Sequence, residues 1–422
     1  MGNVMIIYPK PDENKSPRFG FSYDMMIIAT VLANEGNNVI IKDFSCEGYD
    51  YDKFCADIED SLIDLVLIEF DSFALKRSEN YSHGSELTSI IKRINAKLPV
   101  IAYGHYCYIT KEDVYPADDT IKINCFNAIF ESINRSKTLA KQIRSFSDYD
   151  SLPLIRRALL NQIDYYYKNR NSTLIKTADG CENSSIFCQR KGWQRGYQAH
   201  SDRYVLDEFM LLKEQRFGNI WIVDDNFAFN LERAKRILRL LIDNNITEKM
   251  KISISTWSNI DEEFLDLAAM SNIKVISMGI ESGNQSILDF YKKNINLEKT
   301  KSILRYANKQ GLFTVGNFIL GAPMESYQTI EETFNFIREC EFDQVNLKTL
   351  DYMMGSELYE SIIDIAKGRS HLFACLENGF NQFRLQEIID IKHRFLVEYN
   401  KENKERVMRK LIEFGMPYEE MR

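Results

Sequence analysis

Gly180–Cys188 has the sequence Gly-Cys-Glu-Asn-Ser-Ser-Ile-Phe-Cys, a short segment in which two cysteines lie close together. Glycine, asparagine and serine residues predict a loop at this point of the chain. The segment therefore predicts a loop that brings Cys181 and Cys188 close together, with Ser185 between them in the sequence.

The chain around this loop alternates strand and helix patterns. Strand patterns lie at Thr173–Thr177, Asn219–Val223, Lys251–Ser255, Lys274–Met278, Thr314–Leu320 and Gln344–Lys348. Helical apolar spacing lies between them at Leu231–Asn244, Glu262–Met270, Leu297–Gln310 and Thr329–Cys340. Six βα units in this order predict a partial, TIM-like barrel, whose active face is the carboxyl ends of its strands.

The N-terminal part has a second alternating series. Strand patterns lie at Val4–Tyr8, Val39–Phe44, Leu65–Glu69 and Val100–Tyr103, with a weaker fifth region at Ala128–Phe130. Helical patterns lie at Asp24–Asn34, Tyr51–Leu62 and Glu86–Ala96. This alternation predicts an α/β domain with a doubly wound, Rossmann-like parallel sheet. Ligands of such sheets bind beyond the carboxyl ends of the strands, which places Pro9, Asp71, Ser72, Gly104 and His105 near a candidate site.

These patterns predict four regions. Residues 1–135 form the Rossmann-like domain, 136–170 a helical linker, 171–360 the partial barrel and 361–422 a C-terminal region of charged amphipathic helices. Within the linker, Pro153 indicates a turn between two helical patterns, because proline disfavours helix at the residue before it.

Composition indicates an ordinary soluble protein. The 422 residues are 45% hydrophobic and 27% charged, and the formal net charge of −8 argues against a nucleic-acid surface as the main feature. No apolar run approaches the roughly 20 residues of a membrane helix, and no secretory pattern stands at the N-terminus. Most of the eight cysteines lie in apolar context, as reduced, buried thiols do. We therefore expect a cytoplasmic protein without a membrane partner.

Four further motifs follow the cysteine loop in a fixed order. They are Ile222–Phe227, Met278–Gly283 (Met-Gly-Ile-Glu-Ser-Gly), Phe318–Ser326 (Phe-Ile-Leu-Gly-Ala-Pro-Met-Glu-Ser) and Met354–Tyr359. With the loop, this series resembles the radical SAM superfamily, whose cluster loop has the pattern Gly-Cys-x3-Cys-x2-Cys. Ser185 stands where that pattern has its middle cysteine.

The resemblance implies a [4Fe-4S] cluster held by Cys181 and Cys188, and S-adenosyl-L-methionine (SAM) bound at the barrel's carboxyl face. It marks Glu281 as the contact to the SAM ribose. Gly279, Ser282, Gly316 and Gly321 are further SAM-binding candidates, although a turn is an equally good role for Gly316 and Gly321. Asp224 and Asp225 are either an acid/base pair or caps of the following helix, and capping is the commoner use.

The N-terminal half is similar to the cobalamin-binding domain found ahead of the barrel in one branch of that superfamily. Residues on the implied cobalamin side are Phe187, Pro9, Ser72, Gly104 and His105. The chain has no Asp-x-His-x-x-Gly stretch, so a histidine ligand to cobalt is not expected. Phe187 also has packing as an alternative role, since buried aromatic residues are common.

Ser185 leaves three alternatives open, because a hydroxyl is a hard and poor donor for iron–sulfur sites. Ser185 ligates as an alkoxide, or a distant cysteine such as Cys107 or Cys375 completes the site, or the cluster is lost. The main hypothesis is a cobalamin-type radical SAM enzyme, methyltransferase-like, that acts on a small-molecule or peptide substrate and needs a one-electron donor. The alternative is a degenerate relative that binds SAM or cobalamin without reductive cleavage, as a non-radical SAM enzyme or an accessory binding protein.

Overall fold

The computed structural model describes residues 2–10, 21–45, 49–60, 62–70, 80–160, 171–192, 196–366, 369 and 371–415. The chain divides into two compact units. One comprises residues 1–174 with 189–199, and the other comprises residues 175–188 with 200–422. The described residues contain no helix that is both long enough and apolar enough to span a membrane.

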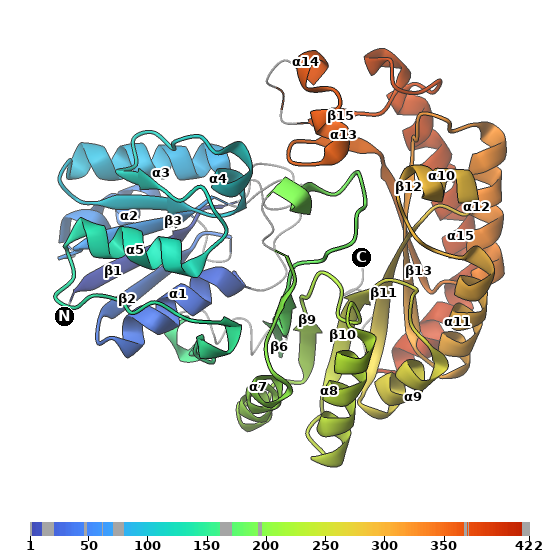
Figure 1. The fold of residues 1–422 in the computed structure, drawn as a ribbon, viewed down its shortest axis with the longest axis horizontal. Coiled ribbons are helices and arrows are strands. Elements are labelled where there is room, and N and C mark those ends of the chain that lie inside the picture. The colour runs from blue at the N-terminus through green and yellow to red at the C-terminus, as the bar shows by residue number, and fades with distance from the viewer. Residues whose placement is uncertain are drawn as a thin grey trace. The chain divides into compact units, whose positions relative to one another are not determined.

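The first unit contains the predicted doubly wound parallel sheet. Its strand order is β2-β1-β3-β4-β5. The strands are β1 (Asn3–Tyr8), β2 (Asn38–Asp43), β3 (Leu65–Glu69), β4 (Val100–Tyr103) and β5 (Asp119–Thr120), and each printed pair is parallel. The helices are α1 (Tyr23–Asn34), α2 (Tyr51–Asp60), α3 (Tyr81–Ile94), α4 (His105–Thr110) and α5 (Phe126–Ser136). Figure 1 shows α2 and α3 on one face of the sheet and α1 and α5 on the other. Because both faces are covered, β3 and β4 are buried along their whole length.

Two expectations for this unit are corrected by the structure. Ala128–Phe130 lies inside α5, and the fifth strand is the two-residue β5. The apolar residues Ile129, Phe130 and Ile133 follow helical spacing and are buried on one side of α5, whereas a two-residue strand has too short a pattern to recognise.

The segment predicted as a helical linker is also different where the structure describes it. Residues 137–160 contain only two short 3-10 helices, at Tyr149–Ser151 and Arg157–Leu159. Asp148 and Ser151 cap each other's backbone N–H groups, and the nearby Pro153 has no N–H with which to extend a helix. Residues 161–170 lie outside the described part of the chain.

The second unit contains the predicted partial barrel. Its six-stranded sheet has the order β13-β12-β11-β10-β9-β6. The strands are β6 (Ser172–Ile175), β9 (Asn219–Ile222), β10 (Lys251–Thr256), β11 (Ile273–Glu281), β12 (Phe313–Leu320) and β13 (Gln344–Thr349). The helices are α7 (Asp202–Glu214), α8 (Leu231–Asp243), α9 (Glu262–Met270), α10 (Gln285–Phe290), α11 (Leu297–Lys309) and α12 (Tyr327–Cys340). Figure 1 shows α8, α9, α11 and α12 along the outside of the curved sheet.

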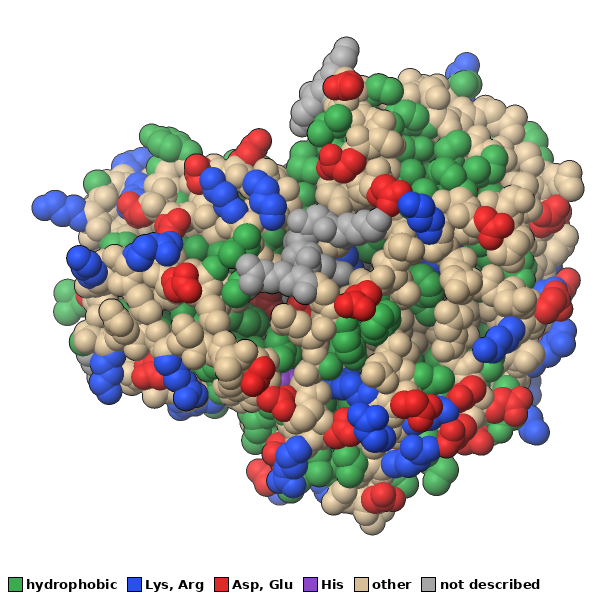
Figure 2. Space-filling view, in the orientation of Figure 1, with side chains coloured by type: hydrophobic (Ala, Val, Ile, Leu, Met, Phe, Trp, Pro, Cys, Tyr) green, Lys and Arg blue, Asp and Glu red, His purple; other side chains and the backbone are tan. Residues whose placement is uncertain are grey.

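The outer helices carry mixed charge. Lys235 of α8 pairs with Asp261 and Glu263 at 2.7 Å each, and Arg239 also pairs with Glu263. Figure 2 shows acidic and basic side chains interspersed over this part of the surface. Such mixed pairs are typical of a solvated helix surface, not of a phosphate-binding one.

The C-terminal region contains more than the predicted helices. β14 (Asp351–Met353) pairs antiparallel with β15 (His371–Phe373), beside the short helices α13 (Glu357–Glu360) and α14 (Ile363–Ala366). The long helix α15 (Leu385–Glu413) follows. Lys410 binds the buried Asp343 at 2.7 Å, and Tyr399 Oη donates to the carbonyl of Phe342 at 2.7 Å. These bonds hold α15 against the segment before β13.

A buried imidazole in the first unit predicts acid sensitivity. His83 is 4% exposed, and its Nδ1 accepts the backbone N–H of Lys10 at 2.9 Å. Burial, with the charge of Lys10, lowers the pKa of His83 to about 4, below the ordinary 6.5. Between these two pKa values the imidazole binds a proton in the unfolded chain but not in the folded one. The free energy of unfolding therefore falls as the pH falls through this window. We expect a loss on the order of 2–3 kcal/mol, measured as the pH dependence of the unfolding midpoint.

His83→Asn keeps an acceptor for the Lys10 N–H and removes the titrating ring, so this variant should lose most of the acid slope. His393→Asn, on the exposed side of α15, is the matched control and should keep the slope. An unchanged slope in His83→Asn would contradict the prediction.

Candidate functional site

The loop with the two cysteines is held in place by its backbone. It begins at Gly180, whose φ of +88° favours glycine. The N–H of Ile186 donates to the carbonyl of Tyr291 at 3.3 Å, and the carbonyl of Ile186 accepts from the N–H of Leu358 at 3.0 Å. The N–H of Cys188 donates to the carbonyl of Ser185 at 3.2 Å. The backbone of Ile186 therefore ties the loop to the end of α10 and to α13.

The side chains of the loop differ in exposure. Cys181 and Cys188 are partly exposed, whereas Ser185 is only 5% exposed. Asn183 Nδ2 donates to Cys181 Sγ at 3.1 Å. The ring of Phe187 meets the ring of Tyr291 edge to face, with centroids 5.1 Å apart. Packing within the second unit thus accounts for the aromatic residue at position 187.

Glu281 ends the strand β11 in an unusual conformation. The register between β11 and β12 shifts between Gly279 and Glu281, which marks a β-bulge. Glu281 has a φ of +78°, a left-handed value that strains a residue with a side chain. Bulges commonly re-aim a side chain beside an active site. Here the result is a carboxylate that is 7% exposed at the carboxyl end of the strand.

Lys293 is the cation that faces this carboxylate. Its Nζ lies 3.1 Å from Glu281 Oε1 and 3.6 Å from the centroid of the Trp257 ring. Lys293 is 3% exposed. Burial lowers the pKa of its ammonium, and Glu281, Cys181 and Cys188 act in the opposite direction. The ammonium is therefore paired with the Glu281 carboxylate and is close enough to the two cysteines for a charge on them to affect its pKa.

Gly279 leaves the space that this ion pair occupies. A Cβ at position 279 would lie 2.7 Å from Glu281 Oε1 and 3.2 Å from Lys293 Nζ. Glycine is therefore required by side-chain packing around the pair.

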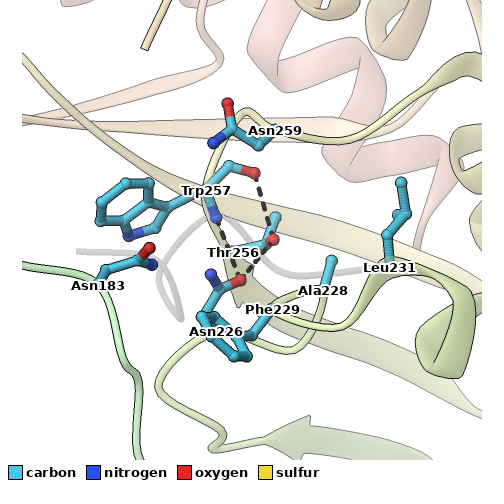
Figure 3. Close-up of a pocket in the computed structure, with 8 residues that line it drawn as sticks. All are labelled: Asn183, Asn226, Ala228, Phe229, Leu231, Thr256, Trp257 and Asn259. Atoms are coloured by element: carbon cyan, nitrogen blue, oxygen red, sulfur yellow. Dashed lines mark hydrogen bonds between the residues drawn. The ribbon is translucent and has the colours of Figure 1, made fainter. Parts of the chain in front are cut away.

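A small polar cavity of about 110 Å³ lies beside Asn183 of the cysteine loop and beside Trp257, whose ring contacts Lys293. Its lining comprises Asn183, Asn226, Ala228, Phe229, Leu231, Thr256, Trp257 and Asn259. Figure 3 shows the Asn183 side chain beside the Trp257 ring, with Asn226 below them. Asn226 Oδ1 accepts Thr256 Oγ1–H at 2.9 Å and the Trp257 N–H at 3.4 Å. The cavity thus joins the cysteine loop to the ends of β9 and β10.

Asp224 connects two strand ends. It is 3% exposed, and its carboxylate accepts the N–H of Thr177 at 2.6 Å and the Thr177 hydroxyl at 2.5 Å. Burial raises the pKa of Asp224 to about 6. The cap of α8 is Asn230, whose side chain accepts the N–H of Arg233. Asp224 therefore ties the segment after β6 to the segment after β9 and does not cap the helix, while Asp225 beside it is partly exposed.

The remaining SAM-binding candidates have local structural partners. The Ser282 hydroxyl lies 3.2 Å from that of Thr333. A Cβ at Gly316 would lie 2.9 Å from the ring of Phe342. Gly321 has a φ of +108°, and its N–H donates to Glu325 Oε2 at 3.0 Å. Packing explains Gly316, and a turn closed by the buried Glu325 explains Gly321.

In the first unit, the carboxyl edge of the sheet carries Pro9, Gly104 and His105. Gly104 has a φ of +113°, and a Cβ there would lie 2.4 Å from the carbonyl oxygen of Phe70, so only glycine fits. His105 begins α4 and is partly exposed. Ser72 and Asp71 lie outside the described residues.

The donors of the cysteine loop fit an iron–sulfur cluster in part. Within the described ranges, no three His, Cys, Asp or Glu side chains are placed together to hold a metal ion. Cys375 is buried and accepts a hydrogen bond from Asn378 at 3.4 Å. Cys107 is buried in α4, and burial raises the pKa of its thiol to about 12. The loop itself supplies two thiols and the Ser185 hydroxyl.

Lys293, Trp257 and Asn226 were not among the residues predicted from the sequence. Lys293 stands in a polar stretch, Lys292-Lys293-Asn294, that is typical of an exposed turn. Its spacing from Glu281 carries no pattern that would distinguish it from Lys292, and only the fold shows which of the two is buried.

Part of the chain matches a known protein family. Residues 175–337 match the family model of the radical SAM superfamily. Cytidylyl-2-hydroxyethylphosphonate methyltransferase of Streptomyces wedmorensis is 28% identical over 198 residues, which cover 45% of the chain and 37% of that protein. The anaerobic magnesium-protoporphyrin IX monomethyl ester cyclase of Rubrivivax gelatinosus is 25% identical over 211 residues, 47% of the chain and 36% of that protein. The chain thus spans between a third and two fifths of these curated relatives.

Two solved structures share the fold of both units. The radical SAM methyltransferase TsrM of Kitasatospora setae, with cobalamin and a [4Fe-4S] cluster bound, matches with a TM-score of 0.71 at 16% identity, over 88% of this chain and 76% of that one. The cobalamin-dependent SAM radical enzyme OxsB, with aqua-cobalamin and SAM bound, matches with a TM-score of 0.70 at 14% identity, over 87% of this chain and 61% of that one. These matches confirm the predicted fold class.

The family match begins at residue 175, where the second compact unit also begins, and it ends within α12. This unit therefore contains a region that matches the radical SAM superfamily.

Proposed function

We propose that the chain is a cobalamin-dependent radical SAM enzyme that transfers a methyl group to, or otherwise modifies, a small organic molecule. The observation that carries the proposal is the buried Glu281–Lys293 pair beside the cysteine loop. A buried ion pair at the carboxyl ends of barrel strands is where catalytic and binding groups of such folds are found. TsrM, which shares the fold, has been solved with tryptophan as substrate, and this supports a small-molecule substrate.

The pair suits the polar groups of SAM. The Lys293 ammonium can neutralise the SAM carboxylate in a site with little water, where a charge-assisted hydrogen bond is strong. The Glu281 carboxylate can accept the two ribose hydroxyls or the amino group. A bound cluster supplies the electron that cleaves SAM, and cobalamin supplies a carrier for the methyl group. The residues described above bind and orient these groups.

The first unit is the proposed cobalamin domain. Its support is the shared fold with TsrM and OxsB. A one-electron donor is the protein partner that the reaction requires. Reduced thiols favour the cytoplasm as its compartment.

Ser185 favours a second candidate function. With two thiols in the loop, the chain can be a relative that binds SAM and uses it as a polar methyl donor, or only as a bound ligand, without reductive cleavage.

Anaerobic reconstitution with iron and sulfide tests the first proposal. We expect about four irons per chain, and their loss in the Cys181→Ala/Cys188→Ala double variant. Reduction by dithionite in the presence of SAM should then yield 5′-deoxyadenosine. Protein that is expressed with cobalamin should retain the cobalamin through gel filtration. Fewer than about two irons per chain contradicts the main proposal, whereas SAM binding without 5′-deoxyadenosine supports the second.

A further inference from the structure

Tyr291 is a buried phenol whose hydroxyl serves no visible purpose. Its side chain is 0% exposed, and in the part of the chain that the structure describes its Oη has no hydrogen-bond partner. Buried polar groups in folded proteins are nearly always paired, and an unpaired one needs an explanation such as a bound ligand. A phenylalanine would fill the same space without the cost of burying a hydroxyl.

The residue contacts the cysteine loop directly. Its carbonyl accepts the N–H of Ile186, and its ring lies against the ring of Phe187 at 5.1 Å. Tyr291 follows α10, two residues before Lys293. Tyr291 therefore contacts the cysteine loop and is close in the sequence to Lys293, the cation that faces Glu281.

The same ring belongs to a core that reaches the segment after β12. Its members include Ile186, Ile319, Ala322, Leu350 and Tyr352. Ala322 follows Gly321, whose N–H is held by Glu325. The side chain of Tyr291 thus packs among apolar residues between the cysteine loop and the turn after β12.

Two carboxylates influence the pKa of the Tyr291 phenol, but neither accepts a hydrogen bond from it. Burial raises the pKa of Tyr291 well above its usual value, and Glu325 and Glu281 add to this effect. The hydroxyl therefore stays protonated at neutral pH and can donate a hydrogen bond. An apolar environment with two nearby negative charges disfavours a carboxylate as its partner. A purine ring nitrogen or a ribose oxygen is a suitable acceptor.

We propose that the Tyr291 hydroxyl is a binding contact for SAM and donates a hydrogen bond to an uncharged acceptor in the adenosyl half of the molecule. The contact rests on the proposed function, because it assigns a new residue to the SAM site. It divides the recognition of SAM in two: Lys293 binds the charged methionyl end, and Tyr291 binds the neutral adenosyl end.

Tyr291→Phe separates this role from a structural one. In full-length, anaerobically reconstituted protein, calorimetric titration should show a five- to tenfold weaker affinity for SAM. The same loss is expected with 5′-deoxyadenosine, while methionine, which lacks the adenosyl group, should bind as it does to the wild type. Without ligand, the variant should unfold at the same or a higher temperature, because it no longer buries an unpaired hydroxyl.

Tyr359→Phe is the matched control from the same core. Tyr359 Oη donates to the carbonyl of Arg369 at 2.7 Å, so removal of this hydroxyl should lower the unfolding temperature and leave SAM affinity within about twofold. Equal SAM affinity in wild type and Tyr291→Phe overturns the inference, as does a lower unfolding temperature of the ligand-free Tyr291→Phe variant. A wild-type protein that binds no SAM overturns the proposed function as well, and the two failures are thereby distinguished.

Discussion

Replacement of Lys293 by methionine should weaken SAM binding about a hundredfold, equivalent to on the order of 3 kcal/mol. Methionine has a similar length and suits the apolar surroundings, so the main loss is the positive charge. The variant removes the proposed counter-ion of the SAM carboxylate and leaves Glu281, which is 7% exposed, without its partner at 3.1 Å. A buried carboxylate without a cation is costly. Equilibrium dialysis or calorimetric titration with SAM measures the effect.

Lys292→Met is the control for this prediction. Lys292 is the chain neighbour of Lys293, but its side chain is 51% exposed, and it pairs with Glu357 at the surface. Exposed ion pairs contribute little, so SAM affinity should stay within about twofold of the wild type. If both lysine variants bind SAM equally well, the proposed role of the buried pair is wrong.

Ser185→Cys should produce the largest change in iron binding. The substitution supplies a third thiolate in a turn that already contains Cys188, whose N–H donates to the carbonyl of Ser185. Thiolate is a much better ligand for iron–sulfur clusters than a serine hydroxyl. We expect the variant to bind about four irons per chain, as the wild type does, and to lose them to a chelator at least about tenfold more slowly than the wild type.

Ser184→Cys is the matched control, because Ser184 is the exposed neighbour of the buried Ser185. A thiol at position 184 should leave iron retention unchanged. Equal stabilisation by the two substitutions would falsify the assignment of position 185 to the cluster. The amount of 5′-deoxyadenosine formed by Ser185→Cys and by the wild type then separates the two proposed functions.

The architecture was largely predictable from the sequence, because it follows from local patterns. The apolar spacing over Glu262–Met270 predicts the helix α9 to the residue, and each of the six barrel strands lies within a few residues of its pattern. Errors arose where the local pattern was short or ambiguous. The strand β15 has three residues, and Ala128–Phe130 belongs to a helix whose apolar side faces the sheet.

The residues of the candidate site also fall into two groups, those that the sequence identifies and those that only the folded structure identifies. Cys181, Cys188 and Glu281 were recognisable because they stand in motifs whose order along the chain is specific. Lys293 and Tyr291 were not recognisable, because adjacent lysines and a tyrosine after a short helix are common in exposed turns. Their role depends on burial, and burial is a property of the packed chain.

Residue order and hydrophobic period are thus enough to specify two α/β units and the resemblance of the second one to a known superfamily, since both act over short stretches of chain. Which lysine faces Glu281, which hydroxyl is buried without a partner, and how many thiols meet at the loop are decided only when distant segments pack together. Once water is excluded, an unpaired charge or hydroxyl has a free-energy cost that it does not have in the unfolded chain, where water solvates it.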